Sequence, residues 1–330
     1  MAPDLIASTD NRVIVGLGTT GLSCARYLHG TGVRFCVVDT REQPPGLDEL
    51  RAQMPDVPVF VGDYPQEVIT GAGELVVSPG VALDQPVVVL AREAGVDVVG
   101  DIDLFMREAQ APVVGITGSN AKSTVTELLG RMARDAGLDT GVGGNLGTPA
   151  LDLLAPGREL YVLELSSFQL ERAGTLGLSV ATVLNISADH LDRHGSMQAY
   201  HQAKHRIFRG CRAAVVNRDD PLTVPLVPQD VEVVGWRMGE PELGGFGLRI
   251  VDGREYLCRG FKTLLPSDEL SLPGRHNVAN ALAALALGNC VGLPVQVMTN
   301  TLRTFRGLPH RCELVGDVDG VRYVNDSKGT

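Results

Sequence analysis

The run from Gly115 to Thr124, GITGSNAKST, combines the groups that hold a nucleotide triphosphate. It follows the apolar residues Pro112–Val114 and leads into a helical pattern that begins at Val125. A strand that turns through small residues onto a helix start directs backbone N–H groups and the helix dipole at one point, which attracts anions. Lys122 adds a mobile cation there, and Ser123 or Thr124 offers a hydroxyl that can hold Mg²⁺. The sequence therefore predicts an ATP-using protein.

This loop departs from the full phosphate-loop pattern G-x-x-x-x-G-K-[ST]. Ala121 stands where that pattern has glycine, and Gly115 lies one place before the position of its first glycine. The chain retains the shorter form G-x-x-[GA]-K-[ST], from Gly118 to Ser123. A turn of this composition also arises from plain helix capping. We favour phosphate binding, because a lysine in the first helical turn opposes the dipole unless an anion is present.

A second glycine-rich turn, Gly16–Gly21 (GLGTTG), follows an apolar strand pattern, and Asp39 ends the next one. This arrangement fits a dinucleotide fingerprint, with the acid on a ribose, although any diphosphate-linked ligand can use the same N–H groups. The alternative is a turn whose glycines serve close helix–strand packing. Asp39–Arg41 and Ser78–Gly80 follow strands of the same sheet, at the end where doubly wound sheets bind ligands. Each could be turn chemistry, but their convergence on one edge favours a binding site.

Three titratable residues follow strands of the second half of the chain. Glu164 interrupts the apolar pattern at 160–165, where carboxylates are rare unless paired or metal-bound. Near a phosphate loop it is a natural Mg²⁺ ligand, and the alternative is a glutamate satisfied by a neighbouring cation. His190 could ligate Mg²⁺ or position a phosphate, although a lone histidine is more often structural. Lys204 lies on a basic helix face that is usually solvated, and it matters only if that face turns toward the phosphates.

Short apolar runs alternate with helical patterns along most of the chain, which predicts α/β architecture with doubly wound parallel sheets. A first set of strands is expected at 12–18, 33–39, 58–61 and 74–77. A helix at 101–109 leads to a second set at 113–117, 161–165, 181–186 and 213–217. Shorter strands with glycine-rich turns predict a small antiparallel sheet between 231 and 261. Helices are expected at 276–291 and 295–305, and a last strand at 320–326.

The composition is that of a soluble globular protein. Its 330 residues suggest about two domains, and its contents of 44% hydrophobic and 21% charged residues are ordinary. The net charge of −10 argues against nucleic acid or an anionic membrane as partner. Six scattered cysteines without a C-x-x-C pair predict free core thiols. No apolar stretch reaches the ~18 residues of a membrane span and the N-terminus lacks a signal-peptide pattern, so we expect a cytoplasmic protein.

Taken together, these motifs resemble those of the Mur ligases, the ATP-dependent amide-forming enzymes of peptidoglycan precursor synthesis. The resemblance covers essentially the whole chain, and so many short motifs in one order are far more specific than any one of them. Beyond the motifs above, it rests on Gly-Gly-Asn145, Glu-Leu-Ser-Ser-Phe-Gln-Leu170, Gly-Arg-His-Asn277, Leu-Pro-His-Arg311 and Asn-Asp-Ser-Lys328.

The resemblance implies three domains. A Rossmann-like N-terminal domain at 1–110 would bind the UDP of the substrate and carry no NAD. A P-loop-type ATP-binding central α/β domain, with the small antiparallel sheet, would occupy 111–307. The last strand pattern is followed by no helix, which predicts that a third domain has been removed and that 308–330 is its stub. The alternative is a frayed natural C-terminus.

The resemblance also implies roles for individual residues. Contacts to the UDP-substrate are expected from Gly18, Thr19, Thr20, Asp39, Thr40, Arg41, Gly80, Asn145 and His190. Contacts to ATP are expected from Gly118, Ser119, Asn120, Ala121, Lys122, Ser123, Thr124, Asn277, Asn280 and Arg311. Magnesium ligands are expected at Ser123, Glu164, His190 and Lys204, the last as a carbamate. The expected catalytic residues are Lys122, His190, Lys204 and Lys328.

The implied reaction joins D-glutamate to UDP-N-acetylmuramoyl-L-alanine. The substrate carboxylate attacks the γ-phosphoryl group of ATP, which gives ADP and an acyl phosphate, while Mg²⁺ and Lys122 neutralise the charge. The amine of D-glutamate then attacks the activated carbonyl, and phosphate leaves. Such a chain is an ADP-forming acid–D-amino-acid ligase, expected as a monomer. Because the missing domain would carry much of the acceptor site, we expect UDP-substrate binding with feeble or no ligation.

Three other functions stay open at this point. An NAD-dependent dehydrogenase would rest on the first domain alone, and it leaves Lys122 and Glu164 without a role. A non-catalytic nucleotide-sugar sensor would use the ATP loop as a switch. A sister Mur ligase that adds a different amino acid is the nearest enzymatic alternative.

Overall fold

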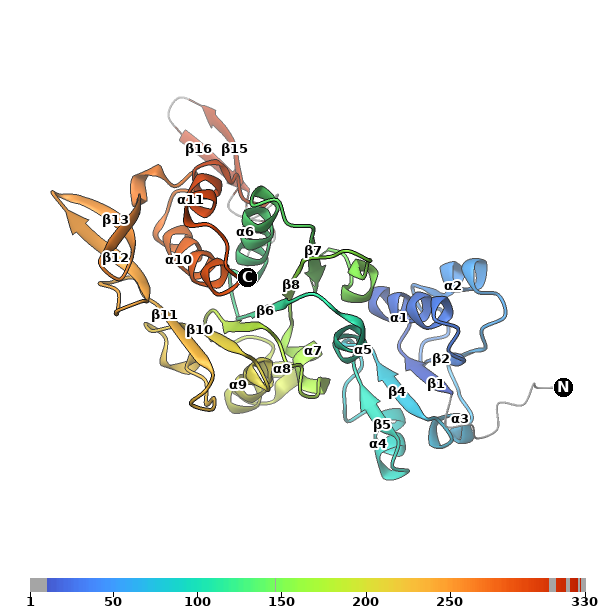
Figure 1. Ribbon diagram of the computed structural model, residues 1–330. Helices are drawn as coiled ribbons and strands as arrows, with labels where there is room; N and C mark the ends of the chain where they lie inside the picture. Colours follow the sequence, from blue (N-terminus) through green and yellow to red (C-terminus); the bar gives the residue numbers. More distant parts are fainter. Residues whose placement is uncertain (1–10, 146, 309–312, 319–320, 326, 328–330) are drawn as a thin grey trace. The chain divides into compact units, whose positions relative to one another are not determined.

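The computed structural model describes residues 11–145, 147–308, 313–318, 321–325 and 327 (Figure 1). The chain forms two compact units. The first comprises the chain up to Ala109 together with Gly147–Leu154 and Ser167–Leu176, and the second comprises the remainder. The sequence placed 147–154 and 167–176 in the central domain, whereas in the structure both segments pack with the first unit.

The first unit is built on a parallel sheet of strand order β3-β2-β1-β4-β5. This is the order of a doubly wound nucleotide-binding sheet. Its strands are β1 (Arg12–Val15), β2 (Phe35–Asp39), β3 (Val59–Val61), β4 (Glu74–Val77) and β5 (Asp97–Val99). Its helices are α1 (Thr19–Gly30), α2 (Leu47–Gln53), α3 (Gln66–Thr70), α4 (Pro86–Glu93), α5 (Asp101–Glu108) and α7 (Ser167–Arg172), with a 3₁₀ turn at Ala150–Leu153.

The central strands of this sheet are buried because apolar side chains occupy both of their faces. Strand β2 is buried along its whole length, and so is β4. Residues of β1, β2 and β4 pack with helix α4 into one apolar core. The near-continuous apolar runs of the sequence are what a parallel sheet covered on both faces requires.

The second unit is built on a nine-stranded sheet of order β14-β13-β12-β11-β10-β9-β6-β8-β7. Its parallel strands are β6 (Val113–Thr117), β7 (Thr140–Gly144), β8 (Leu160–Glu164), β9 (Val180–Val183), β10 (Ala213–Asn217) and β11 (Glu232–Trp236). After β8 the chain crosses β6 and forms β9 on its other side. The carboxyl end of β6 therefore lies at a topological switch point, where open α/β sheets bind their ligands.

The predicted antiparallel pairing is present from β12 to β14. The strands are β12 (Phe246–Val251), β13 (Arg254–Arg259) and β14 (Lys262–Pro266). They extend the central sheet rather than forming a sheet of their own, and β11 pairs parallel with β10 and β12. A further antiparallel pair, β15 (Glu313–Val318) and β16 (Val321–Asn325), follows near the C-terminus.

Helices α6 (Lys122–Asp135), α10 (Arg275–Cys290) and α11 (Val295–Thr304) lie side by side (Figure 1). Residues of α6 and α10 share one core with strands β6 to β14. Helix α10 is apolar around most of its circumference because it packs against both the sheet and the neighbouring helices. The shorter helices α8 (Leu191–His194) and α9 (Met197–His205) follow β9, and 3₁₀ turns lie at Arg206–Phe208, Pro221–Thr223 and Ser267–Glu269.

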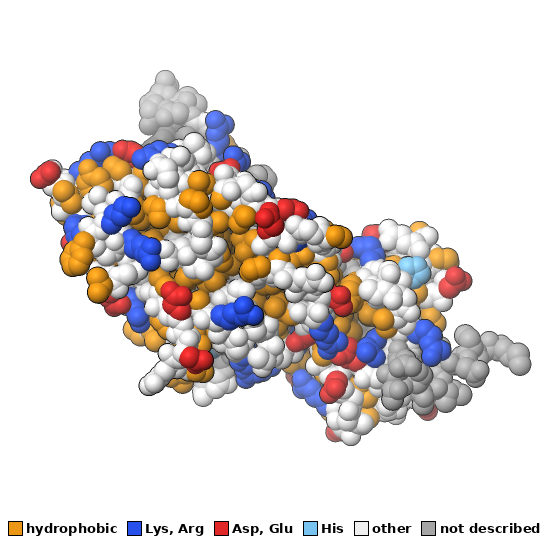
Figure 2. All heavy atoms as spheres, viewed as in Figure 1, with side chains coloured by type: hydrophobic (Ala, Val, Ile, Leu, Met, Phe, Trp, Pro, Cys, Tyr) orange, Lys and Arg blue, Asp and Glu red, His pale blue; other side chains and the backbone are white. Residues whose placement is uncertain are grey.

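The predicted thiol state is confirmed for the five cysteines that the structure describes. Cys24, Cys36, Cys211 and Cys258 are buried, Cys290 is half-buried, and all five are free. Cys312 lies outside the described residues. In the described part of the chain, no helix has the length and apolar character needed to cross a membrane. Acidic and basic side chains are interspersed over the face shown in Figure 2, so the net charge of −10 is not gathered into one patch there.

Candidate functional site

The loop between β6 and α6 starts a helix that has no side-chain cap. Ala121 occupies the cap position in the left-handed conformation, with φ 66° and ψ −2°, and its methyl group cannot accept a hydrogen bond. A helix start leaves its first N–H groups without acceptors inside the helix, and they carry the positive end of the dipole. The capping alternative is therefore wrong for this turn. The uncapped start favours an anion-binding role.

The conformation of this loop is fixed by the segment that follows β9. The side chain of Asn185 accepts a hydrogen bond from the N–H of Asn120 (2.8 Å) and donates one to its carbonyl (3.2 Å). The hydroxyl of Ser119 lies 3.0 Å from the carbonyl of Ser187 and accepts the N–H of that residue at 2.9 Å. The loop is thus pre-formed by bonds to a neighbouring strand end, at the switch point of the sheet.

Two lysine side chains meet at one carbonyl oxygen of this loop. Lys122 Nζ donates to Gly118 O at 2.9 Å and to Ser119 O at 3.0 Å, and Lys204 Nζ donates to the same Gly118 O at 2.8 Å. Lys204 is 2% exposed, so the basic face of α9 is directed into the protein at this position. Burial, and then the nearby Lys122 ammonium, lower the pKa of Lys204 to about 7. A site that gathers two cations is prepared for an anion.

Tyr200, one helical turn before Lys204, completes this buried group. Its hydroxyl lies 3.0 Å from the hydroxyl of Ser119, and Lys204 Nζ lies 4.7 Å from its ring centroid. Burial raises the pKa of Tyr200, and the hydrogen bond with Ser119 partly opposes that effect. No role was predicted for Tyr200 from the sequence. Tyr200 lies four residues before Lys204, which places both side chains on one face of a helix, and this spacing could have identified Tyr200 from the sequence.

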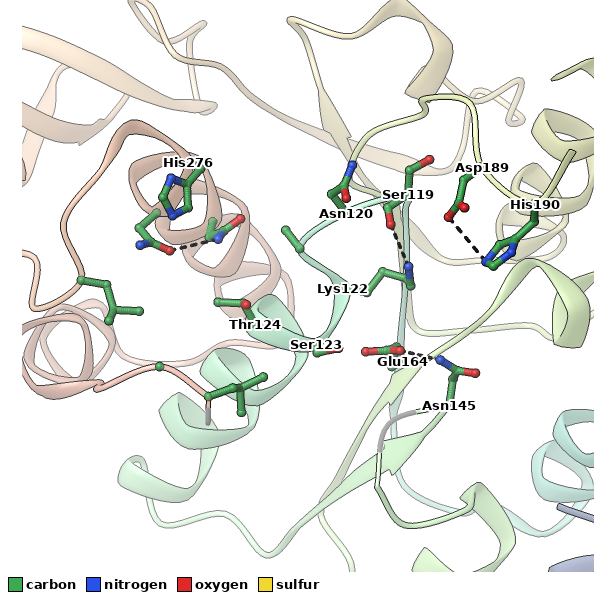
Figure 3. Close-up of a pocket in the computed structure, with 16 residues that line it drawn as sticks. Ser119, Asn120, Lys122, Ser123, Thr124, Asn145, Glu164, Asp189, His190 and His276 are labelled. Carbon is green, nitrogen blue, oxygen red and sulfur yellow. Dashed lines mark hydrogen bonds and ion pairs between the residues drawn. The ribbon is translucent and has the colours of Figure 1, made fainter. Parts of the chain in front are cut away.

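Ser119 and Lys122 of this group line a cavity of about 390 Å³ in the second unit, while Tyr200 and Lys204 are buried behind the loop (Figure 3). Lys122, Glu164, Asp189 and His190 gather beyond the start of α6, and His276 lies across the cavity (Figure 3). The lining residues come from the loop and first turn of α6, the ends of β7 and β8, the segment after β9, the start of α10 and the segment after α11. They are Ser119–Thr124, Asn145, Glu164, Asp189, His190, Leu272, His276, Asn277, Asn280, Gly307 and Leu308.

Glu164 is the buried carboxylate of this cavity and is 3% exposed. Its Oε1 accepts a hydrogen bond from Asn145 Nδ2 at 2.7 Å, while Oε2 has no hydrogen-bond partner among the described residues. A carboxylate oxygen left unsatisfied in a buried site is costly unless it binds a cation. The described part of the chain contains no group of three or more His, Cys, Asp or Glu residues able to hold a metal. The chemistry of a carboxylate oxygen is that of a Mg²⁺ ligand, so Glu164 is the residue of this cavity that could hold the ion together with a hydroxyl, water and phosphate oxygens.

His190 lies at the rim of the cavity. It is one of three described non-glycine residues with positive φ (51°), and its Nε2 is 3.5 Å from Oδ2 of Asp189. Residues held in left-handed conformations cluster at functional sites, and Ala121 of the same cavity is another of the three. The sequence predicted His190 as a site residue but assigned no role to Asp189, although both follow β9.

The remaining predicted ATP residues divide into two groups. Asn277 and Asn280 line the cavity from α10 and are joined by a hydrogen bond of 3.3 Å between Asn280 Nδ2 and Asn277 Oδ1. Arg311 lies outside the described residues, and so does Lys328, which was predicted as a catalytic residue. The sequence analysis gave no role to His276, which lines the cavity one residue before Asn277.

The residues predicted to contact the UDP-substrate in the first unit follow three neighbouring strands. Gly18, Thr19 and Thr20 follow β1, Asp39–Arg41 end and follow β2, and Gly80 follows β4. Asp39 is 4% exposed, and its carboxylate accepts four N–H groups of the protein. Leu17 N and Arg41 Nη2 bind Oδ2 at 2.7 and 2.6 Å, and Arg41 N and Nε bind Oδ1, both at 2.9 Å. Burial raises the pKa of Asp39, but the bonds from Arg41 and Leu17 outweigh this and hold it below its usual value.

The four hydrogen bonds to the Asp39 carboxylate argue against the dinucleotide interpretation, in which this acid binds a ribose. A ribose hydroxyl that bonds to the acid after the second strand needs a free acceptor. The four N–H groups on Asp39 use the acceptor capacity of a carboxylate, which is about four lone pairs. Asp39 therefore acts first on the protein, where it fixes the direction of Arg41.

The three glycines of the turn Gly16–Gly21 are not equivalent. A Cβ on Gly21 would lie 1.9 Å from Gly16 O, and one on Gly16 would lie 2.9 Å from Val81 Cγ2. Packing alone explains both. A Cβ on Gly18 or on Gly80 would meet no atom within 4 Å, so the fold itself does not require glycine there. The packing alternative therefore accounts for Gly16 and Gly21 and not for Gly18.

Comparisons with known proteins identify the class to which this architecture belongs. Residues 10–100 match the family described as Mur ligase MurD-like, N-terminal domain, and residues 116–288 match the Mur ligase middle domain. The chain is a member of the Mur ligase family.

Its relatives narrow the assignment within that family. The chain is 56% identical, over 99% of its length and 73% of the relative, to the UDP-N-acetylmuramoylalanine--D-glutamate ligase of Pseudomonas aeruginosa. It is 53% identical, over the same shares, to the enzyme of that name from Marinobacter nauticus.

Solved structures of the family share the fold. The UDP-N-acetylmuramate:L-alanyl-gamma-D-glutamyl-meso-diaminopimelate ligase from Neisseria meningitides superposes with a TM-score of 0.62 at 20% identity, over 91% of this chain and 99% of that one. The UDP-N-acetylmuramate-alanine ligase from Thermotoga maritima gives a TM-score of 0.55 at 22% identity, over 96% and 74%.

Proposed function

We propose that this chain is an ATP-dependent ligase of peptidoglycan precursor synthesis that joins D-glutamate to UDP-N-acetylmuramoyl-L-alanine, with release of ADP. The observation that carries the proposal is the second-unit cavity, which is lined by Lys122 and an uncapped helix start, with the buried Lys204 bonded to the same loop carbonyl as Lys122, Gly118 O. The 53–56% identity to D-glutamate ligases supports D-glutamate over another amino acid.

In this proposal the loop from Gly118 to Thr124 holds the phosphates of ATP. The first N–H groups of α6 point toward the triphosphate, and Lys122 moves from the loop carbonyls to the phosphate oxygens. Asn277 and Asn280 face the nucleotide from α10. Asn185 and Tyr200 keep the loop in place through Asn120 and Ser119, so little ordering is needed when ATP binds.

Ser123 and Glu164 would hold Mg²⁺ in this site, with phosphate oxygens and water. When bound, Mg²⁺ supplies positive charge that stabilises the phosphoryl group as it transfers to the substrate carboxylate. Asn145 fixes the rotamer of Glu164 through its hydrogen bond to Oε1, so Oε2 is the oxygen directed to the ion. His190, beside Asp189, is our second candidate ligand near the substrate.

In this proposal the neutral amine of Lys204 forms a bond to CO₂ and releases one N–H proton to solvent, which gives an anionic carbamate ligand. That reaction needs a neutral amine, and burial beside Lys122 lowers the pKa of Lys204 to about 7, so a large neutral fraction is present near neutral pH. Converting one of two adjacent cations into an anion also removes the repulsion between them. The carbamate then offers oxygen ligands close to Gly118.

The first unit is proposed to hold the UDP portion of the substrate. Gly18, Thr19 and Thr20 would contact it from the start of α1, where Gly18 leaves the backbone open and α1 has no side-chain cap. Thr40, Arg41 and Gly80 are exposed at the ends of the adjoining strands. Asp39 contributes by orienting Arg41, whose guanidinium is a natural partner for an anionic ligand.

The test is a calorimetric titration of the chain with UDP-N-acetylmuramoyl-L-alanine, and with the ATP analogue AMP-PNP in the presence and absence of Mg²⁺. We expect both ligands to bind, and AMP-PNP to bind more tightly with Mg²⁺. Glu164→Gln is expected to weaken the Mg²⁺-dependent affinity by at least about tenfold, since losing even an outer partner of a metal site costs 10–100-fold. Glu159→Gln, exposed just before the other end of β8, is the matched control. Equal Mg²⁺ dependence in the two variants would contradict the assignment of Glu164.

A further inference from the structure

Arg172, at the end of α7, is a buried cation inside the first unit. The residue is 4% exposed, and its guanidinium donates to a series of backbone carbonyls. Nε bonds to Phe168 O at 2.8 Å, within its own helix. Nη1 bonds to the carbonyls of Val77 (3.2 Å) and Ser78. A buried cation of this kind is costly unless its donors are filled, so its position is closely specified.

The other side of the fork holds the turn that follows β4. Arg172 Nη2 donates to Pro79 O at 3.2 Å and to Val81 O at 3.1 Å. Together the two Nη atoms bond to four carbonyls within the five residues Val77–Val81. Gly80 of the same turn is exposed, and a Cβ on it would meet open space. The guanidinium thus closes the turn around one residue that faces outward.

The same turn is joined to the glycine-rich turn after β1. Ser78 Oγ donates to Gly16 O at 2.7 Å, and Ser78 N donates to Val15 O at 2.9 Å. The side chain of Val81 lies close to the place of a Cβ on Gly16, 2.9 Å away. Moving the Ser78–Val81 turn would therefore move the start of the Gly16–Gly21 turn. Both turns belong to the edge of the sheet where we place the nucleotide-sugar.

Helix α7 and the residue pair that follows it are bonded to the first turn of helix α5. Gln169 Nε2 donates to Asp101 Oδ2 at 2.8 Å, and Gly174 N donates to Asp103 Oδ1 at 2.8 Å. Burial raises the pKa of Asp101 to about 6, while Gln169 and the charge of Arg172 oppose the shift. A Cβ on Gly100 would lie 2.9 Å from Cγ of Arg172, so the stem of the arginine is packed as closely as its head. Arg172 is therefore held at its guanidinium by the carbonyls of Val77–Val81 and at its aliphatic stem by contact with Gly100.

We propose that Arg172 is a positioning residue for the nucleotide-sugar site, because it fixes the Ser78–Val81 turn and, through Ser78, the Gly16–Gly21 turn. It does so without contacting the ligand. The inference rests on the proposed function, since it takes the UDP-substrate as the ligand of these turns. Arginine is needed because a lysine ammonium presents its donors from one point, whereas the planar fork reaches carbonyls on both sides.

The experiment compares Arg172→Lys with wild type in calorimetric titrations of the full chain. The probes are UDP-N-acetylmuramoyl-L-alanine and, separately, AMP-PNP with Mg²⁺. We expect the variant to bind the UDP-sugar about tenfold or more weakly, as for lost bonds to a charged group, with AMP-PNP affinity unchanged. Arg107→Lys is the matched control, because Arg107 pairs with Glu74 at the opposite end of β4. It should leave both affinities unchanged.

Ser78→Ala is a milder second variant that keeps the chain length and packing of the turn but breaks its bond to Gly16. It is expected to weaken the UDP-sugar and not AMP-PNP. Wild-type UDP-sugar affinity in either variant, or equal loss of both ligands in Arg172→Lys, overturns the inference. If wild type fails to bind the UDP-sugar, the proposed function fails and the inference with it. Normal wild-type binding with unaffected variants overturns the inference alone.

Discussion

The left-handed backbone of Ala121 gives a test of whether the phosphate loop is shaped for its ligand at the expense of stability. Ala121 has φ 66° at the start of α6, and it is half-buried against the core of the second unit. An L-residue in this conformation costs roughly 1–2 kcal/mol relative to glycine, because its Cβ crowds the following carbonyl oxygen. Ala121→Gly removes that strain and keeps the turn.

Two other effects of the substitution act in the opposite direction. Glycine adds conformational freedom to the unfolded chain, which costs about 0.4–1 kcal/mol. The lost half-buried methyl group costs about 0.4 kcal/mol, half of the value for a fully buried CH₂. Ala136→Gly, at the other end of α6, is the matched control, because Ala136 has φ −80° and is also half-buried against the core. The two costs are shared, so the two variants should differ in unfolding free energy by the strain alone, about 1–2 kcal/mol.

The assay is urea unfolding followed by the fluorescence of Trp236, the single tryptophan, which is buried on β11 of the second unit. We expect Ala136→Gly to be destabilised by about 0.8–1.4 kcal/mol, and Ala121→Gly to lie between about 0.4 kcal/mol less and about 1.2 kcal/mol more stable than wild type, with AMP-PNP affinity retained. Equal destabilisation of the two variants would refute the reasoning, since it would mean that the left-handed turn carries no strain in the folded protein.

Two further predictions concern the same cavity. The pKa of Lys204 is about 7 in the folded protein against 10.5 as the ordinary value, so the unfolded chain binds more protons between these values and stability rises with pH there, by up to about 1.4 kcal/mol per unit. Urea unfolding in CO₂-free buffer at pH 7 and 8.5 should show a larger rise in wild type than in Lys204→Met. The buried cysteines, whose pKa values are raised, oppose the rise as the pH approaches 9, but both proteins share them, so the difference reports Lys204. Asn185→Ala should destabilise the second unit by about 0.5–1.5 kcal/mol, because the exposed Asn120 N–H exchanges its bond to Asn185 for one to water, and should weaken AMP-PNP binding in calorimetry. Retained affinity in that variant would mean that the hydrogen bonds from Asn185 are not needed to hold the loop in its binding conformation.

The sequence was sufficient where function depends on residues at the carboxyl end of a strand. Asp39, Gly80, Glu164 and His190 each stand at or just after an apolar run, and in a parallel sheet the carboxyl ends of neighbouring strands meet at one edge. The strands predicted at 74–77 and 213–217 have those bounds in the structure, as β4 and β10. These strands can be predicted from local sequence because a strand of a covered parallel sheet is buried on both faces, so most of its residues are apolar.

The sequence was insufficient where function depends on the rotation of a helix. Lys204 reads as part of a solvated basic face, and only the packing of α9 shows that its ammonium reaches Gly118 O. Arg172 is similar. Nothing in the segment Ser167–Arg172 indicates that it leaves the chain's second sheet and packs with the first unit, where its arginine bonds to Val77–Val81. These contacts span many residues of chain, and no short pattern encodes them.

Two buried carboxylates, Asp39 and Glu164, stand at the ends of strands in sheets of the same class, and their hydrogen bonds separate their roles. Asp39 accepts four protein N–H groups, so its charge is already neutralised by the fold and it can act on a ligand only through Arg41. Glu164 accepts a bond from Asn145 at one oxygen, and its second oxygen is unsatisfied in a cavity that the loop of α6 also lines. A buried charge that the protein does not neutralise needs a partner from outside. The same functional group, in the same place on two sheets, therefore orients a side chain in one unit and, in our proposal, binds Mg²⁺ in the other.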